Sequence, residues 1–203
     1  IKECNEIGIM IGNLHKITTN FDKKRENTLD IKEWKKLFNK FENYKDEKFE
    51  PIIKELKKEI NFLEISWPDK LPSGIIHADL FKDNIFFKDE KISGVIDFYF
   101  SCYHFFLYDI SLVINDWCFV DNGKTFKDEY YQSIIEGYNT VRSIINDEWK
   151  IFNILLRAAA VRILVTRLHD YIFHQEDAIV VKKDPFQYYN ILKWHQNNSV
   201  LEI

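Results

Sequence analysis

Apolar residues recur at helical spacing through the first third of the chain. Ile7, Ile11, Leu14 and Ile17 fall on one face of residues 2–18, which predicts an amphipathic helix there. The same spacing continues downstream. The pattern predicts an opening section of helices over residues 2–18, 28–44 and 50–64.

Capping and breaking residues mark the boundaries of this section. Thr28 or Asp30 opens the second helix, because short polar side chains cap helix N-termini, and Pro51 lies near the start of the third. The stretch SWPDKLPSG follows, with two Pro and one Gly in nine residues. It predicts the end of the helical section.

The pattern then changes to short β-rich runs. GIIHA, NIFF and KISGVIDFYF are rich in β-branched and aromatic residues, and KDEK between the last two predicts a hairpin. Helical spacing returns over residues 107–119, 125–144 and 147–172, and again after Pro185. The order predicts a mostly helical α+β fold in which the loops of a small β insert carry the chemistry.

Composition and charge exclude several classes of function. The 203 residues are 46% hydrophobic and 16% aromatic, as in globular proteins, and the net charge is −4. Lys alternates with Glu at helical spacing, which favours solvated helix faces over a nucleic-acid surface. No apolar run approaches the roughly 18 residues that a membrane span requires, and EIGIMIGNL lacks the features of a signal peptide. We therefore expect neither nucleic acid nor a membrane as a partner.

The cysteines indicate a reducing environment. Cys4, Cys102 and Cys118 are odd in number and form no CxxC pair. A disulfide framework or a zinc site is not expected, and the cytoplasm is the expected location.

Four polar residues stand among the apolar residues of the insert: His77, Asp79, Asn84 and Asp97. Each one alone is most simply interpreted as a cap, a turn residue or a satisfied polar group. Asp97 is harder to explain in this way, because it ends the run GVI, which looks fully buried. Burial of an unpaired charge costs several kcal/mol, so we expect Asp97 to point into a site that holds a cation.

Phosphoryl transfer uses this set of groups. In kinases an Asp orients the acceptor hydroxyl, while an Asn five residues later and an Asp after the next hairpin hold Mg²⁺ against the phosphates. Asp79, Asn84 and Asp97 stand in that order, and His77 would orient the loop through hydrogen bonds. HExxH, GxSxG and GxxxxGK[ST] do not occur, and the glycines form no phosphate-binding loop. The insert therefore predicts a phosphotransferase that uses ATP and Mg²⁺.

Three stretches resemble a known family. HADLFKDNIFF, GVIDFYFSCYHFFLYDISLVINDWCF and RAAAVRILVTRLHDY closely resemble the bacterial homoserine kinases of the aminoglycoside phosphotransferase and choline kinase-like superfamily. The HxDxxxxN pattern and the terminal ID are shared by the whole superfamily, whereas the other two stretches are more specific. The resemblance covers about residues 5–195.

The resemblance implies a protein-kinase-like C-terminal lobe over residues 1–203, with the catalytic loop and metal-binding hairpin in residues 74–100. It implies ATP-dependent phosphorylation of L-homoserine to O-phospho-L-homoserine, in threonine biosynthesis. Asp79 would be the catalytic base, and Asn84 and Asp97 would hold Mg²⁺.

Family members also have an N-terminal β-rich lobe with a Lys that grips the nucleotide, and nothing in this chain resembles that lobe. The chain begins at Ile1 and its single methionine is Met10. We therefore expect a fragment, a processed chain or the product of an unusual start codon.

Residues outside the motif have two interpretations each. Asp109 in LYDIS matches an acidic residue that supports the catalytic loop in the superfamily, and it could equally be a charge favoured at a helix N-terminus. Arg162 and Arg167 are candidates for binding the substrate, since Arg can hold a carboxylate with two parallel hydrogen bonds. For Arg162 a neighbouring acid is the favoured partner. His169 and Asp170 are expected to be structural.

Two alternative functions stay open. The first is another small-molecule kinase of the same fold, acting on an aminoglycoside or a choline-like amino alcohol. The second is a remnant or binding module that does not catalyse.

Overall fold

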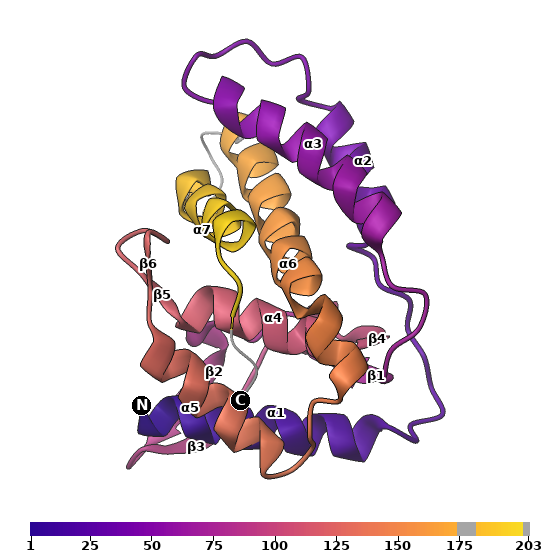
Figure 1. Cartoon of the computed structure of the whole chain (residues 1–203), viewed down its shortest axis with the longest axis vertical. Helices are drawn as coiled ribbons and strands as arrows, with labels where there is room; N and C mark the ends of the chain where they lie inside the picture. The colour runs from indigo at the N-terminus through magenta and orange to yellow at the C-terminus, as the bar shows by residue number, and fades with distance from the viewer. Residues whose placement is uncertain (174–181, 201–203) are drawn as a thin grey trace.

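The computed structural model describes residues 1–173 and 182–200 (Figure 1). Its helices are α1 (Lys2–Thr18), α2 (Ile31–Asn39), α3 (Glu50–Ser66), α4 (Phe106–Trp117), α5 (Asp128–Asn139), α6 (Asn146–Phe173) and α7 (Pro185–Asn197). Its strands are β1 (Ser73–Ile76), β2 (Ile85–Lys88), β3 (Lys91–Val95), β4 (Cys102–Phe105), β5 (Phe119–Val120) and β6 (Thr125–Phe126). The predicted α+β class, mostly helical with small strands, is confirmed.

The second helix is shorter than the predicted 28–44. The Asp30 side chain caps α2 by accepting a hydrogen bond from the Glu33 N–H at 3.0 Å, which leaves Thr28 outside the helix. Beyond α2 the chain continues in turns. The cap therefore decides between the two candidate starts in favour of Asp30.

The predicted hairpin is present, and the neighbouring β-rich run GIIHA pairs with a strand outside it. β2 and β3 are antiparallel, joined by Asp89 and Glu90 with φ of 50° and 62°, as in a tight hairpin turn. The run KISGVIDFYF is not one strand, because β3 ends at Val95 and Phe98–Phe100 forms a 3-10 turn. β1 pairs instead with β4, a strand that the sequence analysis did not predict.

The predicted helix over 125–144 was wrong at both ends. Asp121, Asn122 and Gly123 all have positive φ and turn the chain into a small hairpin, so that β6 occupies the expected start of the helix. The Asn-Gly pair is a known hairpin signal that the helical interpretation overlooked. The helix α5 therefore begins only at Asp128 and ends at Asn139.

Helix α6 links the two ends of the molecule. It packs against α4 and α7, and near its C-terminal half against α2 and α3, which form the upper end of the view in Figure 1. At the lower end α1 and α5 lie side by side beneath α4. The β1–β4 pair and the β2–β3 hairpin belong to this lower part, so residues 74–100, where the chemistry was predicted, are carried by short strands held among helices.

Close packing of α1 on α5 depends on glycine. A Cβ on Gly8 would lie 2.1 Å from the Ile134 carbonyl oxygen, and one on Gly137 would lie 2.3 Å from the Asn5 carbonyl oxygen. Neither helix could approach the other this closely with a larger residue at these positions. The contact fixes Tyr138 of α5 against α1.

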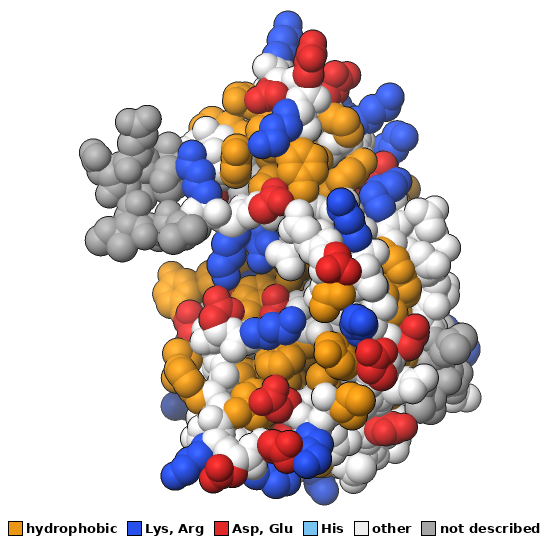
Figure 2. Space-filling model, turned by 90° about the vertical axis from the view of Figure 1, so that its left-hand side faces the viewer, with side chains coloured by type: hydrophobic (Ala, Val, Ile, Leu, Met, Phe, Trp, Pro, Cys, Tyr) orange, Lys and Arg blue, Asp and Glu red, His pale blue; other side chains and the backbone are white. Residues whose placement is uncertain are grey.

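The surface agrees with a globular protein. Acidic and basic side chains are interspersed on the face shown in Figure 2. Within the described residues no helix is long and apolar enough to cross a membrane. Cys4, Cys102 and Cys118 are free and buried.

Candidate active site

The loop that follows β1 is held in a strained conformation. Ala78 has φ of 64°, a left-handed conformation that costs energy for any residue with a Cβ. Its N–H donates to Asp109 Oδ1 at 2.8 Å, and its carbonyl accepts a hydrogen bond from Arg162. The backbone N–H and the carbonyl of Ala78 are thus each held by a side chain, Asp109 and Arg162. These contacts set the direction of the chain into the next residue, Asp79.

Asp79 lines a cavity, and its side chain is 13% exposed. Asn84 Nδ2 donates to the Asp79 carbonyl at 2.8 Å and approaches its carboxylate at 3.4 Å. Arg162 Nη2 lies 3.4 Å from the same carboxylate. Burial raises the pKa of Asp79 above its ordinary value, and the nearby Arg162 charge only partly offsets this. A carboxylate with a raised pKa is a better proton acceptor than an exposed one.

His77 connects the loop to the hairpin. Its ring is buried, Nδ1 accepts a hydrogen bond from the Asp79 N–H at 3.2 Å, and Nε2 donates to the Ile96 carbonyl at 3.0 Å. The ring also lies 4.5 Å from that of Phe98. His77 therefore links the backbone of Asp79 to the residues on either side of Asp97.

The predicted burial of Asp97 was wrong. Ile96, Asp97 and Phe98 are all exposed, and β3 has no fully buried residue. The GVI run looked buried because it is apolar, but within the described residues the open face of the β2–β3 hairpin has no covering layer. Asp97 itself is left-handed, with φ of 62°. It is near enough to Asp79 to raise the pKa of that residue.

Asn84 and Asp97 fit a magnesium site. The Ile96 N–H donates to the Asn84 carbonyl at 3.0 Å, which places both residues at the same end of the hairpin. Mg²⁺ bound with phosphates needs only one or two protein oxygen ligands. Within the described residues no group of three or more His, Cys, Asp and Glu could hold a metal by itself. The donor set therefore suits a metal that is shared with a nucleotide.

A fully buried carboxylate supports the loop from below. Asp109, in the first turn of α4, accepts hydrogen bonds from the backbone N–H groups of His77 at 3.1 Å and Ala78 at 2.8 Å. It therefore occupies both predicted settings, a helix N-terminus and the support of the loop. Burial by itself would raise the Asp109 pKa, but the hydrogen bond with His15, supported by the Ala78 N–H, holds it below its ordinary value.

A cavity of about 310 Å³ opens beside Asp79. Arg162, Thr166 and Asp170 line it at helical spacing along α6, and Arg167 and Lys183 add positive charge. Arg162 lines the cavity while its Nη1 and Nη2 contact the loop. Arg167 Nη1 donates to Gln187 Oε1 at 2.7 Å.

Several residues that lie at this site were not predicted to lie there. His169 and Asp170 were expected to be structural, yet both line the cavity. The four-residue spacing from Arg162 through Thr166 could have assigned Asp170 to the same helical face. Lys183 and the buried His15 gave no such signal, since tertiary packing alone brings them to the loop.

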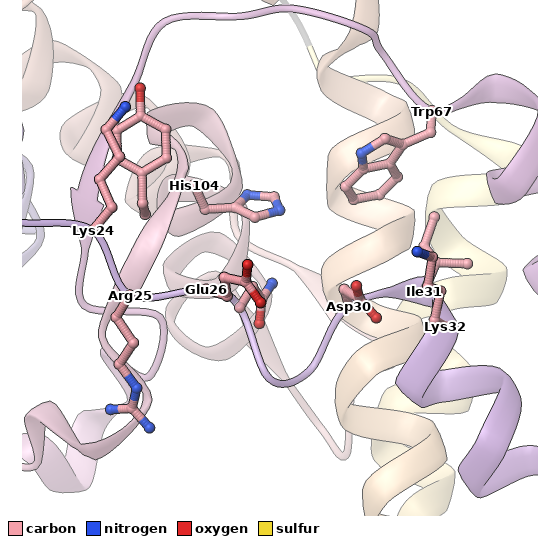
Figure 3. A pocket seen from close by; sticks show the side chains of 10 residues that line it. Lys24, Arg25, Glu26, Asp30, Ile31, Lys32, Trp67 and His104 are labelled. Carbon is pink, nitrogen blue, oxygen red and sulfur yellow. The ribbon is translucent and has the colours of Figure 1, made fainter.

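A larger cavity, of about 750 Å³, lies elsewhere (Figure 3). It opens between the segment that precedes α2 and the side chains of Trp67 and His104. Asp79, Asn84 and Asp97 do not line it. Size alone would therefore misplace the candidate site.

Comparison with known proteins gives concordant results. Residues 2–144 match the phosphotransferase enzyme family, APH. The chain is 39% identical over 195 residues to the homoserine kinases of Agrobacterium fabrum and Rhizobium etli, and 38% identical over 197 residues to that of Bartonella henselae. These alignments cover 96–97% of the chain but only 60–61% of the relatives. The chain thus spans about three fifths of the length of the curated relatives it matches.

Solved structures share the fold. The amicoumacin kinase hAmiN, in complex with AMP-PNP, Ca²⁺ and Ami, aligns with a TM-score of 0.63 and 14% identity, over 97% of this chain and 58% of that one. The gentamicin–APH(2″)-IIa complex aligns with a TM-score of 0.51 and 17% identity, over 98% of this chain and 64% of that one. At these identities the likeness concerns the fold alone.

Proposed function

Because the chain belongs to the phosphotransferase enzyme family, we propose that it forms the catalytic lobe of an enzyme that transfers a phosphoryl group from ATP to the hydroxyl of a small molecule. The observation that carries this proposal is the left-handed Ala78, held by Asp109 and Arg162 so that Asp79 meets Asn84. Strained residues persist where the surrounding structure enforces them, and they concentrate at functional sites.

Asp79 is the proposed base. Its carboxylate would orient the acceptor hydroxyl and take its proton, and the Asn84 amide and the Arg162 guanidinium would hold the carboxylate in place. Asn84 and Asp97 would hold Mg²⁺, which neutralises charge on the phosphates when it is bound. His77 would keep the Asp79 loop and the Asp97 turn in register through its two hydrogen bonds.

The proposed acceptor is L-homoserine. The curated relatives named above are homoserine kinases, and the cavity beside Asp79 carries charges of both signs. Arg167 and Lys183 suit the carboxylate of an amino acid, and Asp170 suits its ammonium group. Arg167 and Lys183 also contact Gln187 and Asp83, but Lys183 is 54% exposed. Arg162 was also predicted to bind the substrate, and we assign it chiefly to the loop because its side chain is only 3% exposed and both its Nη1 and Nη2 contact the loop.

A separate β-rich lobe is proposed to cover the nucleotide. Phe86, Ile96 and Phe98 are between 47% and 52% exposed on or next to the β2–β3 hairpin. Exposed apolar residues that gather in this way mark interaction surfaces. The Lys that grips the phosphates would come from that lobe, as the resemblance implies.

The test is a phosphorylation assay on the protein as its gene encodes it. ADP release is measured with MgATP and L-homoserine, an aminoglycoside or a choline-like amino alcohol, and D79N is the control. Saturable release with homoserine that is lost in D79N is the expected result. A preference for another acceptor would contradict homoserine as the substrate but would support the kinase activity. No ADP release with any acceptor would favour a non-catalytic binding module.

A further inference from the structure

A series of buried side chains connects the turn between α5 and α6 to the base of the catalytic loop. Glu148 is fully buried and accepts two hydrogen bonds from Arg142 Nη2, each of 2.9 Å. Arg142 Nη1 donates to the Tyr138 hydroxyl at 2.9 Å. We refer to these three residues, which come from the end of α5, the following turn and the start of α6, as the arm: Tyr138, Arg142 and Glu148.

The arm ends on His15, whose ring is completely buried. His15 Nδ1 lies 2.9 Å from the Tyr138 hydroxyl, and Nε2 lies 3.1 Å from Asp109 Oδ2. Asp109 in turn accepts the backbone N–H groups of His77 and Ala78. An unbroken line of hydrogen bonds thus runs from the α5–α6 turn to the residue before Asp79.

The direction of each hydrogen bond follows from its donor. Arg142 can only donate, so the Tyr138 oxygen accepts from it and gives its own proton to His15 Nδ1. Nε2 then carries the single ring proton and donates it to the ionised Asp109. The opposite tautomer would turn a lone pair of Nε2 toward the carboxylate. Burial lowers the pKa of His15 and keeps the ring neutral, despite Asp109 on α4 and Glu148 beyond Arg142.

Stacking holds the same groups in place. The Arg142 guanidinium lies 5.0 Å from the centre of the Phe106 ring, and the His15 ring stacks on the same ring with 4.5 Å between the ring centres. Phe106 precedes Asp109 by one helical turn of α4. The arm therefore contacts the support of the loop by hydrogen bonds and by ring packing.

A purely local role would explain only part of this geometry. Glu148 Oε2 also accepts the Ile145 N–H at 3.1 Å, so the Arg142–Glu148 pair does order the turn into α6. That task does not require Arg142 Nη1 to reach Tyr138, or Tyr138 to reach a neutral histidine beneath the loop.

We propose that Tyr138, Arg142 and Glu148 are positioning residues for the reaction proposed above, acting through His15 on Asp109 and thereby on the left-handed Ala78 that directs Asp79. The proposal rests on the proposed function for its effect on turnover, and on the structure alone for its effect on the loop.

The chain offers a matched pair of variants for the test. Y138F removes the hydroxyl that joins Arg142 to His15. Y108F removes another buried hydroxyl, on α4 beside Asp109, that has no hydrogen-bond partner within the described residues. In the kinase assay, well below the unfolding temperature, Y138F should lower kcat by about 5- to 50-fold, because a lost hydrogen bond loosens the geometry of the base. KM for ATP and for the acceptor should change by less than about 2-fold, and Y108F should match the wild type.

Two readouts separate positioning from stability and from the proposed function. The ¹⁵N resonance of His15 Nδ1 should move in Y138F and in R142K, which cannot bridge Tyr138 and Glu148 as the Arg fork does, but not in Y108F. Hydrogen exchange at the Ala78 amide should become faster in Y138F and stay unchanged in Y108F.

Equal kcat and equal Ala78 exchange in Y138F and Y108F would overturn the proposal. If the protein transfers phosphate to no acceptor, the proposed function fails, and Ala78 exchange decides the link between the arm and the loop: faster exchange in Y138F supports that link, and equal exchange overturns it.

Discussion

The two sides of the catalytic loop are built differently. On the buried side Asp109 is completely shielded from solvent and accepts hydrogen bonds from His77, Ala78 and His15. On the open side Asp97 is exposed, and its side chain makes no capping hydrogen bond to the 3-10 turn that follows it. The protein thus fixes the position of Asp79 from its buried side and leaves the side of Asp97 open to solvent.

The difference follows from what each carboxylate has to bind. A buried carboxylate is stable only when protein donors replace water, as they do for Asp109. An exposed carboxylate such as Asp97 keeps its hydration, so its oxygens stay free for the Mg²⁺ that we propose it holds. The left-handed backbone at Asp97 costs comparatively little, because Asp tolerates this conformation better than most residues.

The largest expected effect concerns the open side as a whole. Residues 1–203 alone should show no detectable homoserine-dependent ADP release and should bind MgATP weakly at best. Without a second lobe to exclude water and position the phosphates, much of the roughly 7–11 kcal/mol available from proximity is lost. Steady-state assays on the pure polypeptide check this, and saturable release that disappears in D79N would contradict it.

Asp97 should matter for turnover and not for folding. D97A in the active protein is expected to lower Mg²⁺-dependent turnover by at least about 10³-fold, since a metal supplies several kcal/mol of charge stabilisation. D97N, which tolerates the left-handed backbone, separates loss of charge from backbone strain. The unfolding free energy of D97N should stay within about 0.5 kcal/mol of the wild type. Near-normal activity in D97A would show that the metal assignment is wrong.

Asp79 should affect the chemical step. D79N is expected to lower kcat by about 10²- to 10⁴-fold while ATP affinity changes little, because a general base acts in the transition state. Pre-steady-state kinetics and nucleotide titration measure the two quantities. An equal loss of ATP binding would mark Asp79 as structural.

Asp109, in contrast to Asp97, should matter for the stability of the fold. D109A removes the shared acceptor of two backbone donors and His15, and should lower the free energy of unfolding by about 3–5 kcal/mol in urea denaturation. The control is D147A, whose side chain is 73% exposed and which should change stability by less than about 0.5 kcal/mol. Similar stabilities for D109A and D147A would contradict the buried support.

Per pH unit, the smallest expected effect is a dependence of stability on pH. Burial lowers the pKa of His104 to about 4 and of His195 to about 3, whereas both protonate near 6.5 in the unfolded chain. Acid therefore favours the unfolded state: stability is complete above about pH 6.5 and falls as the pH drops toward 4. Each histidine contributes a slope of at most about 1.4 kcal/mol per pH unit.

Denaturation at several pH values measures this slope, and H104F provides the comparison. The Nδ1 atom of His104 is buried without a hydrogen-bond partner within the described residues, so Phe can replace the ring at little cost. H104F should reduce the slope of stability against pH by the contribution of one histidine, at most about 1.4 kcal/mol per pH unit. An unchanged slope would show that His104 is not neutral in the folded protein.

The sequence by itself determined the helical sections, the β2–β3 hairpin and the order of Asp79, Asn84 and Asp97, because periodicity, turn residues and motif spacing are local properties of a chain. The same local signals located α6 closely, but they misplaced the start of α5, where the Asn122–Gly123 turn outweighs helical spacing.

Only the tertiary structure decided how these residues are held. Whether a strand is covered depends on what packs against it, so the apolar run before Asp97 could not reveal that this residue is exposed. His15 lies 94 residues from Asp109, and Tyr138 lies 123 residues from His15. Contacts between residues so distant in sequence are set by helix packing, here the close approach of α1 and α5 at their glycines, and the pattern of the chain carries no local record of them.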